Sequence, residues 1–271
     1  MEKIDRLGWA AGIALTSYGV RIGIRVNDPA VLDRVQQHLP CGWKPAASPV
    51  VERLYSLLVG GAGRRPNLRR FNLLYGNLER LARTLDLEEV FERLESDLRL
   101  NVAELARRKV FVHAGVVGWR GKAILIPGRS FSGKTTLVAE LVRAGATYYS
   151  DEYAVLDERG RVHPFLKPLS IREDGSHKQT PHRVESLGGV PGAKPLAVGL
   201  ILMSQYKEGA RWRPRQLSPG QGALELLANT VSARRQPEAA LATLRQVVAD
   251  APTLKGVRGE ASQVVAAILK R

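Results

Sequence analysis

Cysteine, aromatic residues and long apolar runs are all scarce in this chain of 271 residues. Cys41 is the single cysteine, which excludes an internal disulfide framework and a cysteine-based zinc cluster. No apolar run approaches the roughly 20 residues that a membrane-spanning helix needs. The N-terminal segment, MEKIDRLGWA, lacks the basic and then apolar pattern of a signal peptide. We therefore expect a cytoplasmic protein with no membrane partner.

Acidic residues are fewer than basic ones, and the formal net charge is +15. Such an excess is typical of proteins that bind nucleic acid. However, aromatic residues make up only 6% of the chain, and the arginines are scattered over predicted helices and loops. No basic stripe with interleaved stacking residues results, so we do not expect nucleic acid as a partner. We interpret the charge as a solvated basic surface that helps attract a polyanionic nucleotide and an acidic protein substrate.

The most specific motif lies in residues 122–136, KAILIPGRSFSGKTT, where a strand pattern runs into a helix pattern. Gly128, Gly133, Lys134 and Thr135 fit G-x-x-x-x-G-K-[ST], the phosphate-binding P-loop. The glycines permit backbone angles that turn N–H groups towards phosphate oxygens, and the following helix N-terminus attracts anions. Lys134 would face the β- and γ-phosphates, and the Thr135 hydroxyl would bind Mg²⁺. The motif therefore predicts ATP and Mg²⁺ as cofactors.

The residues expected to contact the nucleotide form a segment that we call the glycine loop (residues 128–136). They are Gly128, Arg129, Ser130, Phe131, Ser132, Gly133, Lys134, Thr135 and Thr136.

Two adjacent acids, Asp151 and Glu152, follow the glycine loop after one predicted helix and one short strand. Adjacent acids usually form only a solvated turn. Here the short return places their carboxylates beside the glycine loop, near Mg²⁺ and the γ-phosphate. In most P-loop enzymes the strand that bears the acid lies much farther along the chain, so this spacing indicates a subset of them. His113 lies in the strand before the loop, where a histidine alone is more often a structural hydrogen-bonding group than a catalyst.

Three segments in combination carry a resemblance to a known family. VHAGVV (112–117), GRSFSGKTT (128–136) and AGATYYSDEYAVLD (144–157) are similar to the C-terminal catalytic domain of the HPr serine kinase/phosphorylase family, whose core is likened to phosphoenolpyruvate carboxykinase. That family has a histidine closely followed by glycine before the P-loop and a pair of acids after the P-loop helix. The resemblance covers residues 110–172.

The resemblance implies a role for each matching residue. Asp151 would be the general base for a substrate hydroxyl, and His113 would orient or tune it. Lys134 would act on the phosphates during catalysis. Glu152 and Thr135 would hold Mg²⁺. The family makes a homo-oligomer plausible.

The chain also departs from the family pattern. Glu152 stands where the family has aspartate, and the centre of the glycine loop, residues 129–132, is bulkier than usual. A later glycine-rich signature of the HPr enzymes is missing, and the N-terminal region differs from theirs. These differences predict a divergent relative and leave the phosphoryl acceptor open.

The predicted fold is α/β, with a P-loop kinase domain of the HPr kinase type, a mixed sheet flanked by helices, and a smaller N-terminal subdomain. Residues 1–85 form the small α/β subdomain and residues 86–271 the catalytic domain, which opens with a long amphipathic helix from Asp86. Strands are expected at 10–26, 50–61, 69–77, 110–117, 122–127 and 196–206. Helices are expected from Pro29, Ser218 and Pro237. A polar segment of the catalytic domain, 173–195, is expected to be a mobile loop or lid.

Two basic residues beyond the acids, Lys167 and Arg172, are candidates to reach phosphate or an acidic substrate. An ordinary surface charge is the commoner reason for such residues. His177 and His182 lack an acidic partner pattern, so we expect no metal site there.

The expected function is an ATP- and Mg²⁺-dependent kinase that transfers the γ-phosphoryl group to a serine-type hydroxyl of a protein or peptide. One alternative is a nucleotide-binding sensor or scaffold protein without kinase turnover. A further alternative is a kinase for a small molecule that resembles free serine.

Overall fold

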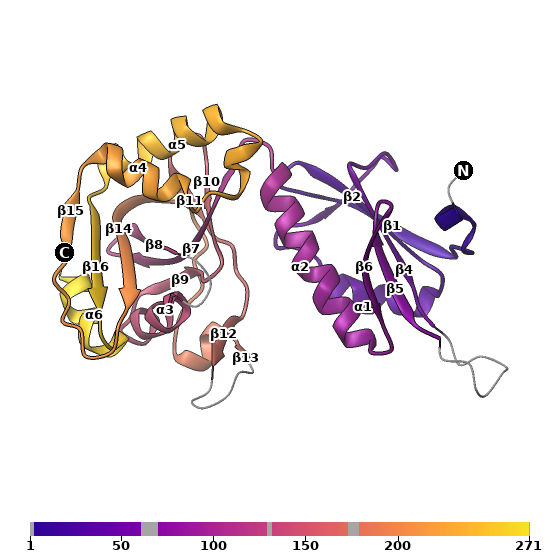
Figure 1. Cartoon of the computed structure of the whole chain (residues 1–271), viewed down its shortest axis with the longest axis horizontal. Coiled ribbons are helices and arrows are strands. Elements are labelled where there is room, and N and C mark those ends of the chain that lie inside the picture. Colours follow the sequence, from indigo (N-terminus) through magenta and orange to yellow (C-terminus); the bar gives the residue numbers. More distant parts are fainter. Residues whose placement is uncertain (1–2, 61–69, 129–131, 173–178, 271) are drawn as a thin grey trace. The chain divides into compact units, whose positions relative to one another are not determined.

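The computed structural model describes residues 3–60, 70–128, 132–172 and 179–270. Contacts between Cα atoms divide the chain into two compact units, Met1–Arg107 and Arg108–Arg271 (Figure 1). Across the described ranges the fold is mixed α/β, with two mixed β-sheets, a separate two-stranded hairpin and six α-helices.

The N-terminal unit is built on a six-stranded sheet in the order β3-β1-β2-β4-β5-β6. The predicted strands at 10–26, 50–61 and 69–77 are confirmed, with 10–26 forming a hairpin, whereas the short β3 and the polar edge strand β6 carry no apolar alternation that could predict them. The strands are β1 (Ala11–Ser17), β2 (Val20–Val26), β3 (Lys44–Pro45), β4 (Arg53–Leu58), β5 (Asn72–Gly76) and β6 (Glu79–Thr84).

A short helical stretch follows β2, as its proline pattern predicts. The Asp28 side chain accepts a hydrogen bond from the Ala30 amide over 3.0 Å, which caps a 3-10 turn at Pro29–Val31. Helix α1 (Leu32–Gln37) continues from that turn. The cap satisfies one of the amide groups that a helix start leaves without a partner.

The long amphipathic helix is confirmed as α2 (Leu87–Leu105), and the Asp86 side chain caps it through the Glu88 amide. Its buried stripe packs on β5 and β6 of the N-terminal sheet. The division of the chain therefore falls after this helix, at Arg107, and not before it at residue 85. The reason is that the stripe is buried on the first sheet, a choice of partner that periodicity alone does not encode.

The C-terminal unit holds an eight-stranded mixed sheet in the order β11-β10-β7-β8-β14-β16-β15, with β9 also paired to β7. Its central strands β8, β14 and β16 are parallel, and β11 pairs a second time with the start of β14. The strands are β7 (Val110–Trp119), β8 (Lys122–Pro127), β9 (Thr147–Ser150), β10 (Tyr153–Leu156), β11 (Arg161–His163), β14 (Leu196–Tyr206), β15 (Arg215–Leu217) and β16 (Thr253–Arg258).

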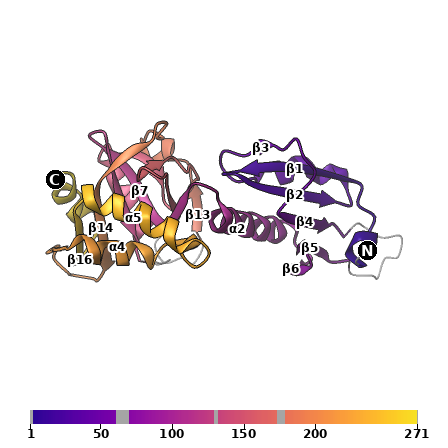
Figure 2. The same cartoon turned by 90° about the horizontal axis from the view of Figure 1, so that it is seen from above.

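Helices cover both faces of this sheet, as Figures 1 and 2 show. One core lies between the sheet and helices α3 (Lys134–Arg143) and α6 (Ala261–Leu269). The other core lies between the sheet and helices α4 (Pro219–Leu227) and α5 (Pro237–Asp250). Alternating residues of β8 enter the two cores, so this strand is buried on both sides, which is typical of a central parallel strand.

The segment at 173–195, predicted as a mobile loop or lid, contains regular structure in its described part. A strand, β13 (Gln179–His182), pairs there with β12 (Leu169–Arg172), and a 3-10 turn follows at Val184–Leu187. Residues 173–178, which include His177, lie outside the described residues, as does the side chain of Arg172. The segment therefore contains regular structure that its polar composition did not indicate.

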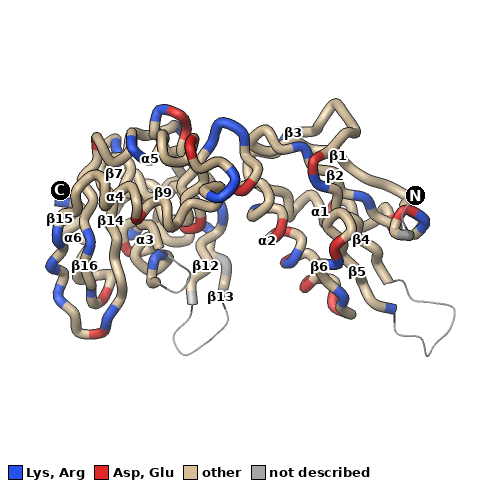
Figure 3. Tube along the Cα trace, turned by 45° about the horizontal axis from the view of Figure 1, so that its top comes forward, with Lys and Arg blue, Asp and Glu red and all other residues tan. Residues whose placement is uncertain are grey.

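Lys and Arg residues, blue in Figure 3, occur on many elements of both units. Acidic residues, shown in red, are interspersed among them, and the basic residues do not follow one element.

The burial of α2 leads to a stability prediction. Leu94 is 0% exposed and Leu100, on the same helix, is 45% exposed. Leu94→Ala should lower the free energy of unfolding by about 2 to 5 kcal/mol because it leaves a cavity in a packed core. Leu100→Ala, the matched control, should change it by less than about 0.5 kcal/mol. Urea titration followed by circular dichroism measures both, and equal losses would contradict this packing.

Candidate functional site

Strand β7 lies between the two acids and the start of the glycine loop. Its Ala114 amide donates to the Glu152 carbonyl over 3.1 Å, on the side where β9 and β10 pair. The carbonyl of the preceding residue, His113, accepts from the Gly128 amide over 3.2 Å, on the side where β8 pairs. Two neighbouring residues of one strand therefore hold the acid pair and the glycine loop on either side of it.

The end of the glycine loop has the backbone that the motif predicts. Gly133 adopts a left-handed conformation, with φ of 80°, directly before helix α3. Its carbonyl accepts from the Leu137 amide over 3.2 Å and so begins the helix. Lys134 is the first residue of α3 and is only 7% exposed. The loop therefore places its lysine at a helix N-terminus inside the unit.

Helix α3 approaches β7 closely because of a glycine. A Cβ at Gly115 would lie 2.5 Å from the Val138 Cγ2 of the helix. No real side chain fits at that distance, so the glycine after His113 in the sequence is explained by packing. This contact sets the distance between the glycine-loop helix and the strand that carries His113.

The other glycine-loop residues differ in how they are placed. The Ser132 Oγ is buried and has no hydrogen-bond partner among the described residues. Thr135 is half-buried at the second position of α3, and Thr136 is exposed. Arg129, Ser130 and Phe131 lie outside the described residues, so their contacts with a nucleotide stay predictions.

Asp151 is held by two groups that the sequence did not indicate. The Ser170 amide donates to its Oδ2 over 3.3 Å, and the Tyr148 hydroxyl lies 3.3 Å from its Oδ1. The same hydroxyl donates to the Lys167 carbonyl over 2.7 Å. Sequence reasoning missed Ser170 because its contribution is a backbone amide, for which no residue type is a signal.

Lys167, one of the two basic residues singled out in the sequence, contacts the acid pair. Its Nζ donates to the Glu152 Oε2 over 3.0 Å. The turn that carries the acids is fixed by the Ser150 Oγ, which accepts from the Glu152 amide over 3.1 Å and from the Tyr153 amide over 3.0 Å. Both acids therefore have defined positions on a rigid turn.

Burial shifts the pKa values of these groups. Asp151 is 8% exposed, and its burial raises the pKa of the carboxyl group, against the lowering effects of the Lys167 charge and the Ser170 amide. Burial also lowers the pKa of Lys134 to about 8, although both acids oppose this change. The pKa of His113 falls to about 4 through burial and the Lys134 charge, with Glu152 opposing. The four ionisable groups, His113, Lys134, Asp151 and Glu152, therefore lie close enough to affect one another's charge.

Thr135 and Glu152 can each offer an oxygen to a metal ion. In the part of the chain that the structure describes, no group of three or more His, Cys, Asp or Glu side chains forms a metal cage. Two protein oxygens nevertheless fit Mg²⁺, which usually keeps waters and binds substrate phosphates beside one or two protein ligands. The donor chemistry therefore fits Mg²⁺ carried by a nucleotide.

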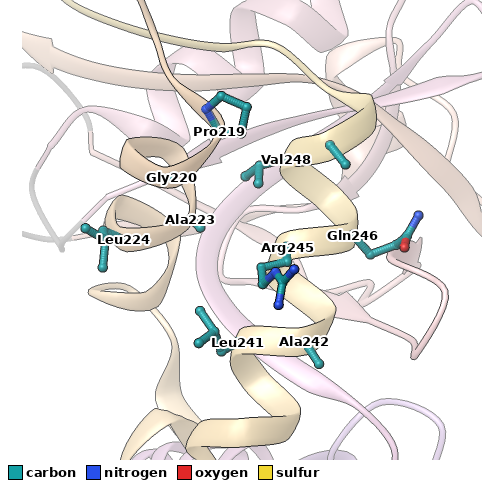
Figure 4. Close-up of a pocket in the computed structure, with 10 residues that line it drawn as sticks. Pro219, Gly220, Ala223, Leu224, Leu241, Ala242, Arg245, Gln246 and Val248 are labelled. Atoms are coloured by element: carbon teal, nitrogen blue, oxygen red, sulfur yellow. The ribbon is translucent and has the colours of Figure 1, made fainter.

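Two of the hollows in the described part of the C-terminal unit bear on the location of the site. A groove of about 780 Å³ runs between α4 and α5, with Leu224, Leu241 and Val248 among the residues that line it (Figure 4). None of the predicted site residues lines that groove. A smaller hollow of about 260 Å³ is lined by Tyr148, Lys167 and Arg183 and so adjoins the groups that hold Asp151.

The chain matches no model of a known protein family, and no curated protein is significantly similar to it. Within the described ranges, no helix has the length and apolar character that crossing a membrane requires.

The partly buried His113 predicts a pH dependence of stability. The pKa of His113 is about 4 in the folded protein, against an ordinary value of 6.5. Folding therefore disfavours its protonation, and the stabilising effect of neutral His113 is full above pH 6.5 and is lost as the pH falls towards 4. The shift corresponds to about 3 kcal/mol at most.

His113→Gln removes this titration. Its free energy of unfolding should fall less steeply than that of the wild type between pH 6.5 and pH 4, as measured by urea titration at several pH values. The difference between the two curves isolates His113 from other titrating groups. Parallel curves would show that His113 is not buried as described.

Proposed function

We propose that the chain is an ATP- and Mg²⁺-dependent kinase that transfers the γ-phosphoryl group to a serine-type hydroxyl of a protein or peptide. In this proposal the C-terminal unit is a P-loop kinase domain of the HPr kinase type. The observation that supports it best is the position of the acid pair and the glycine loop on the two sides of β7. A buried base and a phosphate-binding lysine are thereby brought into one site.

The glycine loop and Lys134 would bind the phosphates of ATP. The amide groups at the start of α3 would donate to the phosphates, and Lys134 adds a buried positive charge. Thr135 and Glu152 would hold Mg²⁺, which would supply neutralisation of the phosphate charge. Phosphoryl transfer depends mainly on such positioning and charge stabilisation.

Asp151 would accept the proton of the acceptor hydroxyl. As the acceptor oxygen bonds to the γ-phosphorus, the bond from that phosphorus to the bridging oxygen breaks, and ADP leaves with the electron pair. The raised pKa of Asp151 makes it a better proton acceptor than an exposed aspartate. The Ser170 amide and the Tyr148 hydroxyl orient its carboxylate.

His113 would act as a neutral neighbour of these groups. With a pKa of about 4 it carries no proton charge at neutral pH, so it does not repel Lys134 or a metal ion. Its carbonyl holds Gly128 at the start of the glycine loop. We propose that His113 helps to orient the groups of the site and transfers no proton.

The acceptor would approach from the side of Tyr148 and Lys167. The hollow of about 260 Å³ adjoins the groups that hold Asp151, and two of the three charged residues in its lining, Lys167 and Arg183, are basic, the third being Glu185. An acidic segment of a protein or peptide fits this lining. The acceptor itself is not specified by these features.

One observation favours a second function, a nucleotide-binding sensor without turnover. The Glu152 carboxylate is engaged by the Lys167 ammonium group, which competes with a metal ion for the same oxygen. In a sensor this pair would persist when nucleotide is bound.

Variants of the two central residues separate binding from chemistry. Lys134→Ala should weaken the binding of ATP with Mg²⁺ at least about tenfold and abolish ADP production, because it removes a charge from the phosphates. Asp151→Asn should retain ATP binding, and its turnover rate should fall by about 10²- to 10⁴-fold, which is the usual contribution of a general base. Calorimetric titration and ADP release measure these effects. Lys122→Ala, at the exposed start of β8, is the control for loss of charge.

Each contrary outcome has a distinct meaning. Retained transfer in Asp151→Asn would remove the base assignment. ATP binding by the wild type without transfer to any acceptor in cell extract would favour the sensor. A wild type that binds no ATP would overturn the nucleotide site as a whole.

A further inference from the structure

Arg258, the last residue of β16, is a buried cation beside the glycine loop. It is 2% exposed, although it is one of the longest side chains in the protein. Its Nη2 donates to the Gly133 carbonyl over 2.7 Å, and its Nη1 donates to the Gly259 carbonyl over 2.9 Å. Its Nε is buried and has no partner in the described parts of the chain. The guanidinium is thus directed at the point where the glycine loop becomes a helix.

The sheet explains this position. Strands β8, β14 and β16 are parallel, so their carboxyl ends meet at one edge. Strand β8 continues there into the glycine loop, and β14 ends at Tyr206, which is paired in register with Arg258. Ligands of open α/β sheets bind outside the carboxyl ends of parallel strands. Arg258 therefore lies at the edge where such a sheet binds its ligand.

Arg258 has no direct ion pair within the described residues, although the charge of nearby Glu260 acts on it. Among the described residues, no Asp or Glu lies within salt-bridge distance of it, and Glu260, two residues along, accepts from the Tyr206 hydroxyl over 2.7 Å. The Tyr206 ring lies 5.8 Å from the Arg258 Cζ and covers the guanidinium with a cation–π contact. Burying a charge is costly unless it is paired, and two carbonyl groups compensate a guanidinium only in part. A bound polyanion would supply the compensating charge.

Arg258 also fixes the conformation of the glycine loop. The Gly133 carbonyl accepts from Arg258 and from the Leu137 amide, so the guanidinium reinforces the left-handed turn that opens α3. A Cβ at Gly133 would lie 2.6 Å from the Arg258 Nη2. The glycine is therefore required by the arginine as well as by its backbone angles.

We infer that Arg258 is a positioning residue of the phosphate site, which holds Gly133 in place and adds a second buried positive charge for the polyphosphate chain of a nucleotide. The inference rests on the proposed nucleotide site. It extends that site to a strand end that lies more than a hundred residues beyond the glycine loop in the sequence.

Binding measurements with two ligands test this role. ATP and inorganic tripolyphosphate are titrated calorimetrically into the wild type, Arg258→Lys, Arg258→Gln and Arg258→Met. Lys255→Met is the matched control, because Lys255 lies on the same strand as Arg258 and its partly exposed side chain pairs with Glu225 of α4. Circular dichroism and the thermal midpoint establish that each variant is folded.

Arg258→Met should bind each ligand at least about tenfold more weakly than the wild type does. The factor should be the same for both ligands, because the lost contribution acts on phosphate. Arg258→Lys should recover part of the loss, and Arg258→Gln, which keeps donors but no charge, should bind more weakly than Arg258→Lys. The control should bind as the wild type does. Tighter binding by Arg258→Lys than by Arg258→Gln is a result that a role limited to hydrogen bonding at Gly133 would not give.

Contrary results separate this inference from the proposed function. A folded Arg258→Met that binds both ligands as the wild type does would overturn the inference and leave the nucleotide site intact. A loss confined to ATP would overturn the phosphate role. Where Arg258→Met does not fold, equal affinities of Arg258→Lys and Arg258→Gln would overturn it. A wild type that binds neither ligand would overturn the proposed function, and the inference with it.

Discussion

The pairing of strand β7 on both of its edges is the constraint on which the candidate site depends. On one edge the Ala114 amide holds the acid turn at Glu152, and on the other the His113 carbonyl holds the start of the glycine loop at Gly128. Because a strand exposes backbone groups on both edges, two adjacent residues suffice to bring two distant segments together. Gly115 then lets helix α3 pack directly on the strand. A shift in this register would move the acids and the loop apart even if every side chain were kept.

The site concentrates charges that the fold must keep buried. Lys134, Asp151 and Arg258 are all nearly inaccessible to solvent, and each is stabilised in a different way. Asp151 has a backbone amide and a tyrosine hydroxyl close to its oxygens, Arg258 donates to two carbonyl groups, and Lys134 feels both acids. Such an arrangement is costly for stability, and buried charges of this kind cluster where function requires them.

Much of this fold follows from the sequence, and the exceptions have physical reasons. Apolar alternation, proline and glycine signals, and the caps at Asp86 and Ser218 predict the main strands and helices. The edge strand β6 was missed because a polar strand has no apolar alternation. Helix α2 was assigned to the C-terminal part because an apolar stripe does not indicate which sheet it will pack against. The closeness of Lys134 and the two acids was predicted from the motif spacing, and that of His113 was implied by the family resemblance. Arg258 was not, since a charged residue at a strand end suggests exposure, and its burial results from packing between segments that are distant in the sequence.

The structure of the protein in complex with Mg²⁺ and a non-hydrolysable ATP analogue tests the central claim most directly. The account predicts that the phosphates lie along the glycine loop, with the γ-phosphate against Lys134 and with Asp151 on the side of it that faces away from the leaving ADP. Thr135 and Glu152 should then be the protein groups nearest to the metal ion. An analogue bound with its phosphates away from Lys134, or seated in the groove between α4 and α5, would contradict the assignment of this edge of the sheet as a phosphoryl-transfer site.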